Sequence, residues 1–239
     1  MKKPNELTVP LQASAATTAL VYPAADDAPT TPRAALILGH GAGAGQRSTF
    51  MVDFARGLSA LGIDVITFNF LYTERKRKLP DRAPVLEGCY RAVIDAVRDR
   101  VDSARRALFI GGKSMGGRIA TQVAAADAAL PLAGLVLLGY PLHPPGQPDR
   151  LRDAHLPAVA RPMLFVQGTR DTFGTPAELA PILSRVSPAP VLHEVAGGDH
   201  SFKLGGRDAA ARQAALYDEI QRVLVEWMAL TAARAGERR

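Results

Sequence analysis

Residues 107–117 read ALFIGGKSMGG, an apolar run that passes into a glycine-rich turn, and this stretch decides the fold. The apolar run has the composition of a buried strand, and the residues from Ser114 to about Ala126 have that of a helix. The spacing Gly112-x-Ser114-x-Gly116 between a strand and a helix is typical of a sharp turn that presents a serine at the carboxyl end of a sheet. Glycines suit a turn whose backbone is strained and closely approached. The pattern predicts Ser114 as a nucleophile.

On both sides of this turn the chain alternates between short apolar runs and helical patterns. Strands that are apolar throughout and separated by helices are buried on both faces. We therefore expect a doubly wound α/β fold, with a mostly parallel sheet and helices on both sides. The predicted strands span residues 17–22, 34–38, 63–70, 107–110, 134–138, 163–167 and 191–195, and the predicted helices span residues 50–61, 85–101, 114–126, 176–184 and 207–229.

The size and composition of the chain favour one domain. Of its 239 residues, 47% are hydrophobic and 22% charged, which is typical of a globular protein and excludes a wholly disordered chain. We expect an α/β domain over residues 33–232. Residues 1–32 are expected to add a strand and a connector to the same domain, and residues 233–239 to form a basic tail.

The charge pattern gives no positive sign of a macromolecular partner. The net charge is +6, and the basic residues gather only in the segment from Arg75 to Lys78 and in the tail. Neither cluster is interleaved with aromatic residues, so we expect no nucleic-acid partner; the first cluster is a solvated loop or a basic rim near a site.

No run approaches the ~18 apolar residues of a membrane span. Without a secretory signal pattern or a membrane span, we expect a cytoplasmic protein, and its one cysteine, Cys89, to be a packed residue.

Two phosphate-binding motifs share features with the glycine turns, and both fail on a missing residue. A Walker A loop that ended at Ser114 would need a glycine where the chain has Ala107. Residues 39–44 satisfy the dinucleotide pattern G-x-G-x-x-G/A, but a dinucleotide site also needs an acid at the end of the next strand. That strand ends at Phe70 without a carboxylate, and Asp64 lies at its beginning. We expect no cofactor.

An acid and a histidine follow later strands in the order that a serine nucleophile requires. In this type of sheet the order is serine, acid, histidine, each in the loop after a strand. Asp171 follows the predicted strand 163–167, and His200 follows the strand 191–195. The competing acids Asp149 and Asp153 precede their strand instead of following it.

The other histidines are in less suitable places. His40 is expected to shape the first glycine-rich loop, His143 and His155 fall in a proline-rich connector, and His193 lies within a predicted strand. No pair of histidines has ligand spacing on one helix, so we expect no metal site.

Together these motifs resemble the α/β-hydrolase superfamily, from about residue 33 to the last helix. The matching segments are residues 40–43 (HGAG), 112–117 (GKSMGG), 167–171 (QGTRD) and 197–202 (GGDHSF). The chain is most similar to the compact dienelactone-hydrolase-like branch and to small hydrolase-like domains of some chromatin-complex subunits.

The resemblance implies roles for five residues. Ser114 would attack a carbonyl carbon, His200 would accept its proton, and Asp171 would hold the imidazole in the required tautomer. The backbone N–H groups of Met115 and Ala42 would form an oxyanion hole.

Two features bear on the substrate. Dienelactone hydrolases use a cysteine nucleophile, whereas the serine at position 114 favours hydrolysis of a carboxylic ester or thioester. Residues 139–162, between two predicted strands, are too few for the helical lid of many relatives, so we expect an open site and a small-molecule substrate. The alternative is a non-enzymatic protein-interaction module on the same fold, and a dinucleotide-dependent oxidoreductase is a more distant one.

Overall fold

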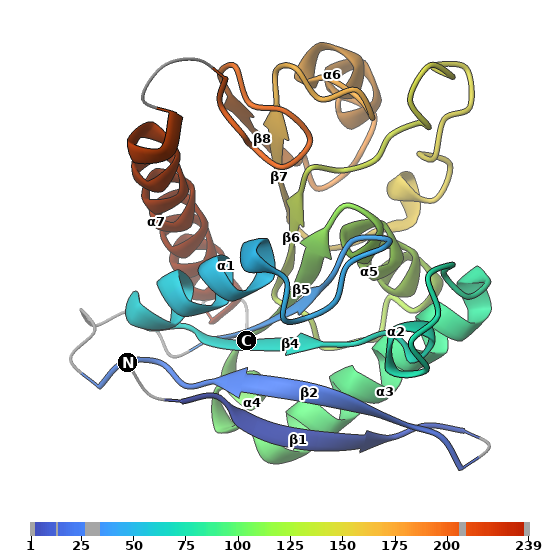
Figure 1. The fold of residues 1–239 in the computed structure, drawn as a ribbon, viewed down its shortest axis with the longest axis vertical. Coiled ribbons are helices and arrows are strands. Elements are labelled where there is room, and N and C mark those ends of the chain that lie inside the picture. Colours follow the sequence, from blue (N-terminus) through green and yellow to red (C-terminus); the bar gives the residue numbers. More distant parts are fainter. Residues whose placement is uncertain (1–2, 13, 27–33, 206–208, 237–239) are drawn as a thin grey trace.

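A computed structural model describes residues 3–12, 14–26, 34–205 and 209–236. Within them, one eight-stranded sheet has the order β1-β2-β4-β3-β5-β6-β7-β8 (Figure 1). The first two strands pair antiparallel, β2 also pairs antiparallel with β4, and all other neighbours are parallel. The strands are β1 (Asn5–Pro10), β2 (Ala16–Tyr22), β3 (Ala35–Gly39), β4 (Asp64–Phe68), β5 (Leu108–Lys113), β6 (Gly134–Leu138), β7 (Met163–Gly168) and β8 (Val191–Val195).

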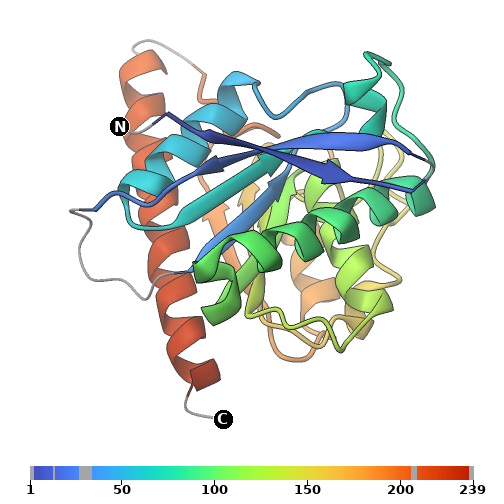
Figure 2. The ribbon, with the colours of Figure 1, turned by 90° about the horizontal axis from the view of Figure 1, so that it is seen from below.

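Helices cover both faces of the sheet (Figures 1 and 2). One face packs against α1 (Thr49–Ala60) and α7 (Ala209–Gly236). The other packs against α2 (Leu71–Glu74), α3 (Ala83–Arg100), α4 (Asp102–Arg106), α5 (Met115–Ala126), the short 3-10 helix η1 (Leu156–Ala158) and α6 (Pro176–Leu183). Within the described segments, none of the helices combines the length and apolarity needed to span a bilayer.

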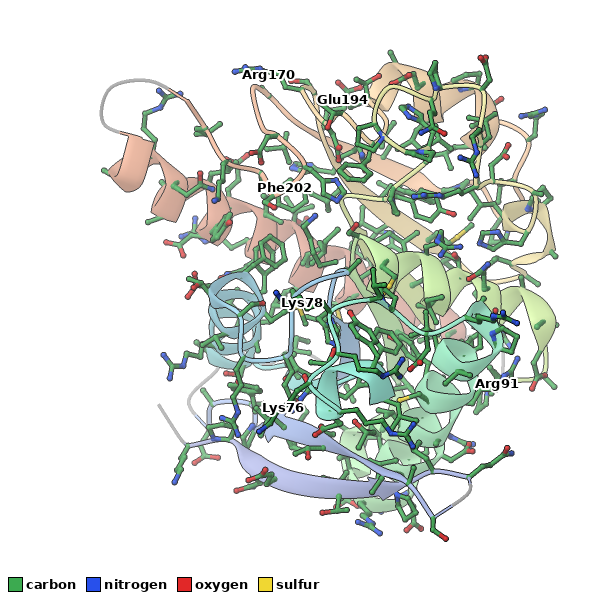
Figure 3. The ribbon with its side chains drawn as sticks, turned by 45° about the vertical axis from the view of Figure 1, so that its right-hand side comes forward. Lys76, Lys78, Arg91, Arg170, Glu194 and Phe202 are labelled. Carbon is green, nitrogen blue, oxygen red and sulfur yellow. The ribbon has the colours of Figure 1, made fainter. Side chains whose placement is uncertain are left out.

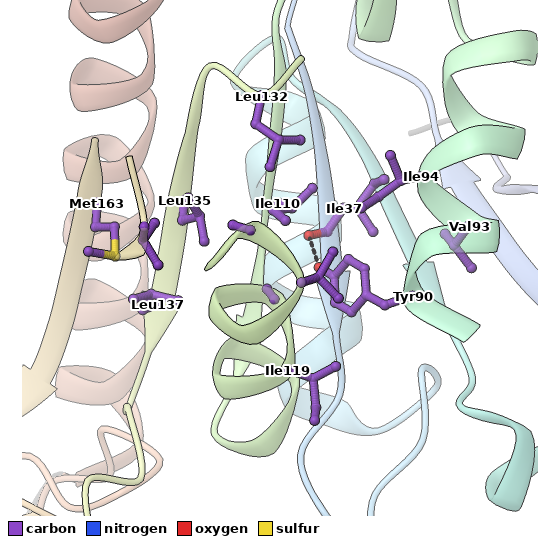
Figure 4. Packing of buried hydrophobic residues seen from close by; sticks show 14 of the residues in the cluster. Ile37, Tyr90, Val93, Ile94, Ile110, Ile119, Leu132, Leu135, Leu137 and Met163 are labelled. Atoms are coloured by element: carbon purple, nitrogen blue, oxygen red, sulfur yellow. Dashed lines mark hydrogen bonds between the residues drawn. The ribbon is translucent and has the colours of Figure 1, made fainter. Parts of the chain in front are cut away.

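Successive residues of the parallel strands enter two separate cores. Ile37 and Ile110 contribute to the core beside α3 and α5 (Figure 4), whereas Leu36 and Phe109 contribute to the core beside α1 and α7. Side chains alternate between the two faces of a strand, so a strand buried on both faces must be apolar throughout. The predicted doubly wound, mostly parallel sheet is confirmed.

A tyrosine hydroxyl in the first of these cores contacts backbone groups of both β3 and β5. The Tyr90 hydroxyl lies 3.0 Å from the Ile37 carbonyl oxygen (Figure 4). It also accepts a hydrogen bond from the Gly111 N–H at 3.0 Å and lies 2.6 Å from the Gly111 carbonyl oxygen. Tyr90 is fully buried, and burial raises the pKa of its hydroxyl above the ordinary value, so the group stays neutral. Helix α3 is thereby hydrogen-bonded to the centre of the sheet.

Several elements differ from the sequence-based prediction. Strand β1 is not predicted because it is an edge strand with mostly exposed side chains and therefore lacks an apolar run. Strand β4 ends at Phe68, since Phe70 is already the N-cap of α2. The short helices α2, α4 and η1 are too brief to show helical periodicity. Helix α7 continues to Gly236, into the segment predicted as a basic tail.

Parts of three predicted segments lie outside the described residues. These are residues 27–32 of the predicted connector, the predicted helix start at residues 207–208, and residues 237–239 of the predicted tail.

The strand order changes direction at β3 and β5. Strand β3 lies between β4 and β5, and the chain leaves β3 for α1 on one face but leaves β5 for α5 on the other. Where two neighbouring parallel strands send their helices to opposite faces, the loops at their carboxyl ends diverge and a ligand site can form between them. The loop 40–45 and Ser114 both lie at this position.

Candidate active site

Ser114 occupies a strained turn between β5 and α5. Its φ is 51° and its ψ is −115°, a backbone conformation that residues other than glycine rarely adopt. The Ser114 N–H donates to the carbonyl oxygen of Leu138 at 3.0 Å, which holds the turn against the end of β6. The serine is also the N-cap residue of α5, so its hydroxyl lies at the positive end of that helix.

The glycines two positions before and after the serine are required by contact with β3. A Cβ at Gly112 would lie 2.2 Å from the carbonyl oxygen of Gly39, and a Cβ at Gly116 would lie 2.1 Å from the same oxygen. Gly112 also has a φ of 151°. The turn can therefore approach β3 only because both positions lack side chains.

Replacing Gly116 by alanine is expected to destabilise the fold by about 3 kcal/mol, because the new methyl group would collide with backbone rather than with a movable side chain. Urea unfolding followed by circular dichroism measures the effect. The matched control is Gly88→Ala on α3, where a Cβ meets nothing within 4 Å. This control should stabilise the protein by about 0.5–1 kcal/mol through helix propensity. Equal stability of the two variants would contradict the close contact.

Ser114, His200 and Asp171 form a hydrogen-bonded chain. His200 Nε2 lies 2.8 Å from Ser114 Oγ, and His200 Nδ1 lies 2.7 Å from Asp171 Oδ2. The side chain of Asp171 is 0% exposed and that of His200 is 20% exposed, so the carboxylate is covered while the imidazole is open to the surface. The ring of Phe173 stacks on the imidazole, with the ring centroids 4.2 Å apart.

The loops after β7 and β8 pack backbone against backbone, which brings the aspartate and the histidine together. The Arg170 N–H donates to the carbonyl oxygen of Gly198 at 2.9 Å, and a Cβ at Gly168 would lie 2.4 Å from that oxygen. Arg170 and Phe202, one on each loop, lie at the same end of the molecule (Figure 3). The relative position of the two loops therefore depends on a glycine at the end of β7.

Three N–H groups hold the carboxylate of Asp171. Its Oδ2 accepts from His200 and from Gln167 Nε2 at 2.8 Å, and its Oδ1 accepts from the Phe173 N–H at 2.8 Å. The Gln167 amide is itself oriented, since its Oε1 accepts from the Tyr140 N–H at 2.8 Å. Sequence reasoning placed Gln167 in the matching segment QGTRD but gave it no role, although a polar residue at the end of the apolar run MLFVQ is a sign that could have revealed one.

The first glycine-rich loop lies directly beside the serine. A Cβ at Gly41 would lie 3.6 Å from the Cβ of Ser114. In the described part of the chain, the backbone N–H groups of Ala42 and Met115 have no hydrogen-bond acceptor. Met115 begins helix α5, where the first N–H groups lack partners within the helix. Two unpaired donors are thus found on the two elements that flank the hydroxyl.

The buried imidazole of His40 joins this loop to the residues that follow β4. Its Nδ1 lies 2.8 Å from the carbonyl oxygen of Gly41, and its Nε2 accepts from the Phe70 N–H at 3.2 Å. Burial lowers the pKa of His40, which is consistent with a neutral imidazole that donates through Nδ1. These contacts agree with the predicted role of His40 in shaping the loop, which stays a prediction.

The remaining candidate residues lie elsewhere. His143 contacts Glu178, His155 contacts Thr121, and His193 lies within β8, as predicted. The acids Asp149 and Asp153 precede β7, and Asp153 lies 4.0 Å from Arg185. None of these five residues is hydrogen-bonded to Ser114 or His200 in the described structure. The predicted packing role of Cys89 is confirmed, since its thiol is buried and burial raises its pKa to about 12.

A known family matches most of the chain. Residues 32–229 match the family described as alpha/beta hydrolase domain. The chain belongs to this family. The predicted resemblance to the α/β-hydrolase superfamily is thereby confirmed.

Solved structures share the α/β-hydrolase fold at low sequence identity. A serine hydrolase without a lid from Xanthomonas campestris is 22% identical, with 93% of this chain and 95% of that chain covered and a TM-score of 0.66. Dienelactone hydrolase from Anabaena variabilis is 20% identical, with 91% and 97% covered and a TM-score of 0.69. Est1E from Butyrivibrio proteoclasticus, with ferulic acid bound, is 13% identical, with 95% and 99% covered and a TM-score of 0.73.

This α/β hydrolase has no helical lid between β6 and β7. Residues 139–162 are all described, and they contain only the 3-10 helix η1. Leu156 of η1 is buried in the core beside α5, so η1 packs against the domain. The side of Ser114 that faces this connection is therefore left without a helical cap.

The basic segment after α2 is a surface loop. Glu74 is part of the fold, since its carboxylate accepts from the Thr18 N–H at 2.9 Å. Arg77 pairs with Asp81, and Lys76 and Lys78 are exposed in the segment after α2 (Figure 3). These contacts favour the interpretation as a solvated loop.

Lys113 links the serine turn of the α/β hydrolase to the loop that carries His200. The residue is only 7% exposed, and its ammonium group donates to the backbone carbonyl oxygen of His200. The ammonium nitrogen also lies 5.7 Å from the centre of the Phe50 ring, within cation–π range. Sequence reasoning missed this contact, because the position before the serine in G-x-S-x-G accepts any residue.

Burial of Lys113 should make stability depend on pH in the alkaline range. Burial lowers its pKa from 10.5 to about 8, while Asp171 and Asp199 act in the opposite direction. The unfolded chain therefore binds more protons than the folded chain between about pH 8 and pH 10.5, so this group makes stability rise with pH across that window.

We expect this rise to be roughly 3 kcal/mol in wild type and absent in Lys113→Met. Urea unfolding of both proteins at a series of alkaline pH values measures the difference between them. Parallel stability curves would contradict a buried, titrating lysine. Lys203→Met, at a lysine whose side chain is exposed, is the control and should follow wild type.

Proposed function

We propose that this protein is a serine hydrolase that cleaves a small carboxylic ester or thioester through an acyl-enzyme intermediate. The observation that carries the proposal is the hydrogen-bonded chain from Ser114 through His200 to Asp171. This arrangement supplies a nucleophile, a base within reach of its proton, and an acceptor that orients the base.

The first half of the reaction forms the acyl-enzyme. Asp171 accepts a hydrogen bond from the Nδ1–H of His200, which keeps the proton on Nδ1 and leaves Nε2 as an acceptor facing the serine hydroxyl. Ser114 Oγ attacks the carbonyl carbon while its proton moves to Nε2. The backbone N–H groups of Ala42 and Met115 bind the oxyanion that develops. Collapse of the intermediate breaks the bond to the leaving alcohol or thiol, which takes the proton from Nε2.

The second half returns the free enzyme. A water molecule gives a proton to His200 Nε2 and attacks the acyl carbon. The new oxyanion uses the same two N–H groups, and its collapse releases the carboxylic acid as Ser114 regains its proton. Residues 139–162 form no helical cap over the site, so water can reach the imidazole of His200. The open site favours small or exposed substrates.

A fluorophosphonate probe, which reacts with activated serines, tests the proposal directly. We expect wild type to be labelled at Ser114 and Ser114→Ala to be unlabelled, while Ser184→Ala, at the exposed C-cap serine of α6, is labelled like wild type. Peptide mapping by mass spectrometry locates the modification. A folded wild-type protein that resists the probe would overturn the proposal and favour the non-enzymatic interaction module.

A panel of esters and thioesters then defines the substrate. The panel should vary acyl chain length and include an ester of ferulic acid, the compound bound in the Est1E structure. We expect the highest kcat/KM for short or compact acyl groups. Activity that increases steadily up to long-chain lipids would contradict the small-substrate proposal.

A further inference from the structure

A large cavity opens at the end of the sheet opposite Ser114. Its volume is about 810 Å³, within the range of small-molecule sites. It is lined by the first residues of three strands, Leu108, Met163 and Val191, whereas Ser114 follows the last residue of β5. The C-terminal part of α7 and the end of α4 form its walls, and these two elements lie near each other in both views of the fold (Figures 1 and 2).

The inner part of the cavity is apolar and contains an aromatic ring. Leu108 and Met163 are almost completely buried there, and Trp227 on α7 is half-buried. The Trp227 ring packs edge-on against Phe109, with the ring centroids 5.8 Å apart, which fixes its orientation. A flat apolar group could enter this part of the cavity and contact the indole.

The rim of the cavity is strongly basic. Five arginines line it, and none of the described residues that line it is an aspartate or a glutamate. The five are Arg98, Arg105, Arg106, Arg161 and Arg234.

Two of these arginines are used by the fold itself. Arg161 donates to the carbonyl oxygens of Ala128 and Leu130, each at 2.9 Å, and Arg105 pairs with Asp102. The guanidinium groups of the other three, Arg98, Arg106 and Arg234, have no hydrogen-bond or ion-pair partner in the described part of the chain. They come from the last turn of α3, the end of α4 and the last turn of α7.

We propose that this cavity binds a small aromatic anion, an aryl phosphate or carboxylate, separately from the site at Ser114. The ring of the ligand lies against Trp227, and the anionic group is held by Arg98, Arg106 and Arg234. A guanidinium group binds a phosphate or carboxylate through two parallel N–H···O bonds, and the guanidinium groups of Arg98, Arg106 and Arg234 keep their N–H donors free for such bonds within the described part of the chain.

Trp227 reports on this cavity directly, because it is the only tryptophan in the chain. Its emission is followed in the full-length protein during titration with phenyl phosphate, benzoate, inorganic phosphate and benzyl alcohol. We expect saturable changes with phenyl phosphate or benzoate, and comparison of the two identifies the preferred anionic group. Benzyl alcohol, which lacks the charge, and inorganic phosphate, which lacks the ring, should bind at least about tenfold more weakly.

Paired variants separate the cavity from non-specific anion binding. The double variant Arg98→Gln/Arg106→Gln should bind phenyl phosphate and benzoate about tenfold or more weakly than wild type. Each substitution removes a charge-assisted hydrogen bond to the anionic group of the ligand. Arg222→Gln, at an exposed arginine of α7 outside the cavity lining, should bind like wild type. The proposal is overturned if neither aromatic anion changes Trp227 emission, if benzyl alcohol binds as tightly as they do, or if the double variant matches wild type. None of these outcomes depends on activity at Ser114.

Discussion

Replacing His200 by alanine is expected to lower kcat for ester hydrolysis by about 10⁶-fold, the size of effect seen when a serine hydrolase loses its general base. In this structure the imidazole is the group placed 2.8 Å from Ser114 Oγ, and Phe173 stacks on it from one side. Without the ring, the serine proton has no acceptor. Steady-state kinetics with a short-chain ester measures the loss.

The His200→Ala variant should keep its fold, which makes the kinetic result interpretable. The substitution retains the backbone carbonyl oxygen that accepts from Lys113. His193→Ala, on the strand that leads to the same loop, is the matched control and should retain wild-type kcat. A folded His200→Ala protein with nearly full activity would exclude His200 as the base.

Replacing Asp171 by asparagine is expected to lower kcat by about 10⁴-fold while leaving KM nearly unchanged. The aspartate oxygens accept from three donors, on Gln167, Phe173 and His200. An asparagine offers only one oxygen, and its amide group donates. If the amide nitrogen faces His200 Nδ1, the imidazole carries its proton on Nε2 and can no longer accept the serine proton.

Asp149→Asn is the matched control for this experiment, because Asp149 is an exposed acid in the connection before β7. It should behave like wild type in both kinetics and urea unfolding. An Asp171→Asn protein with a kcat close to wild type would show that another acid orients His200. Loss of activity together with loss of folded structure would show instead that Asp171 acts mainly in packing the two loops.

The proximity of Ser114, Asp171 and His200 could be predicted, because it depends only on which strand each residue follows. Each residue follows a recognisable apolar strand, and the carboxyl ends of parallel strands lie at one edge of the sheet. A residue's place in the chain therefore determined its place in space. Their catalytic roles stay predictions until the kinetic experiments are done.

Lys113 and Gln167 could not be assigned a role from the sequence, since each acts through a contact distant in the chain. Lys113 reaches the backbone of the loop after β8, and Gln167 joins Asp171 to the loop after β6. Such contacts depend on side-chain direction and loop packing, neither of which leaves a periodic pattern. The edge strand β1 was missed for a related reason, because its partner β2 supplies the hydrogen bonds and little apolar burial is required.

The hydroxyl of Tyr90 has a consequence for how accurately the sheet assembles. The end of β5 is rich in glycine, and glycine-rich strands are prone to slip by a residue against their neighbours. A slipped β5 would leave the Tyr90 hydroxyl without the N–H and carbonyl groups of Gly111 inside an apolar core. Leaving a buried polar group unsatisfied is costly, so Tyr90 selects the correct alignment of β5. The glycines that bring Ser114 close to β3 can therefore lie in and beside β5 while β5 keeps one pairing register with its neighbours.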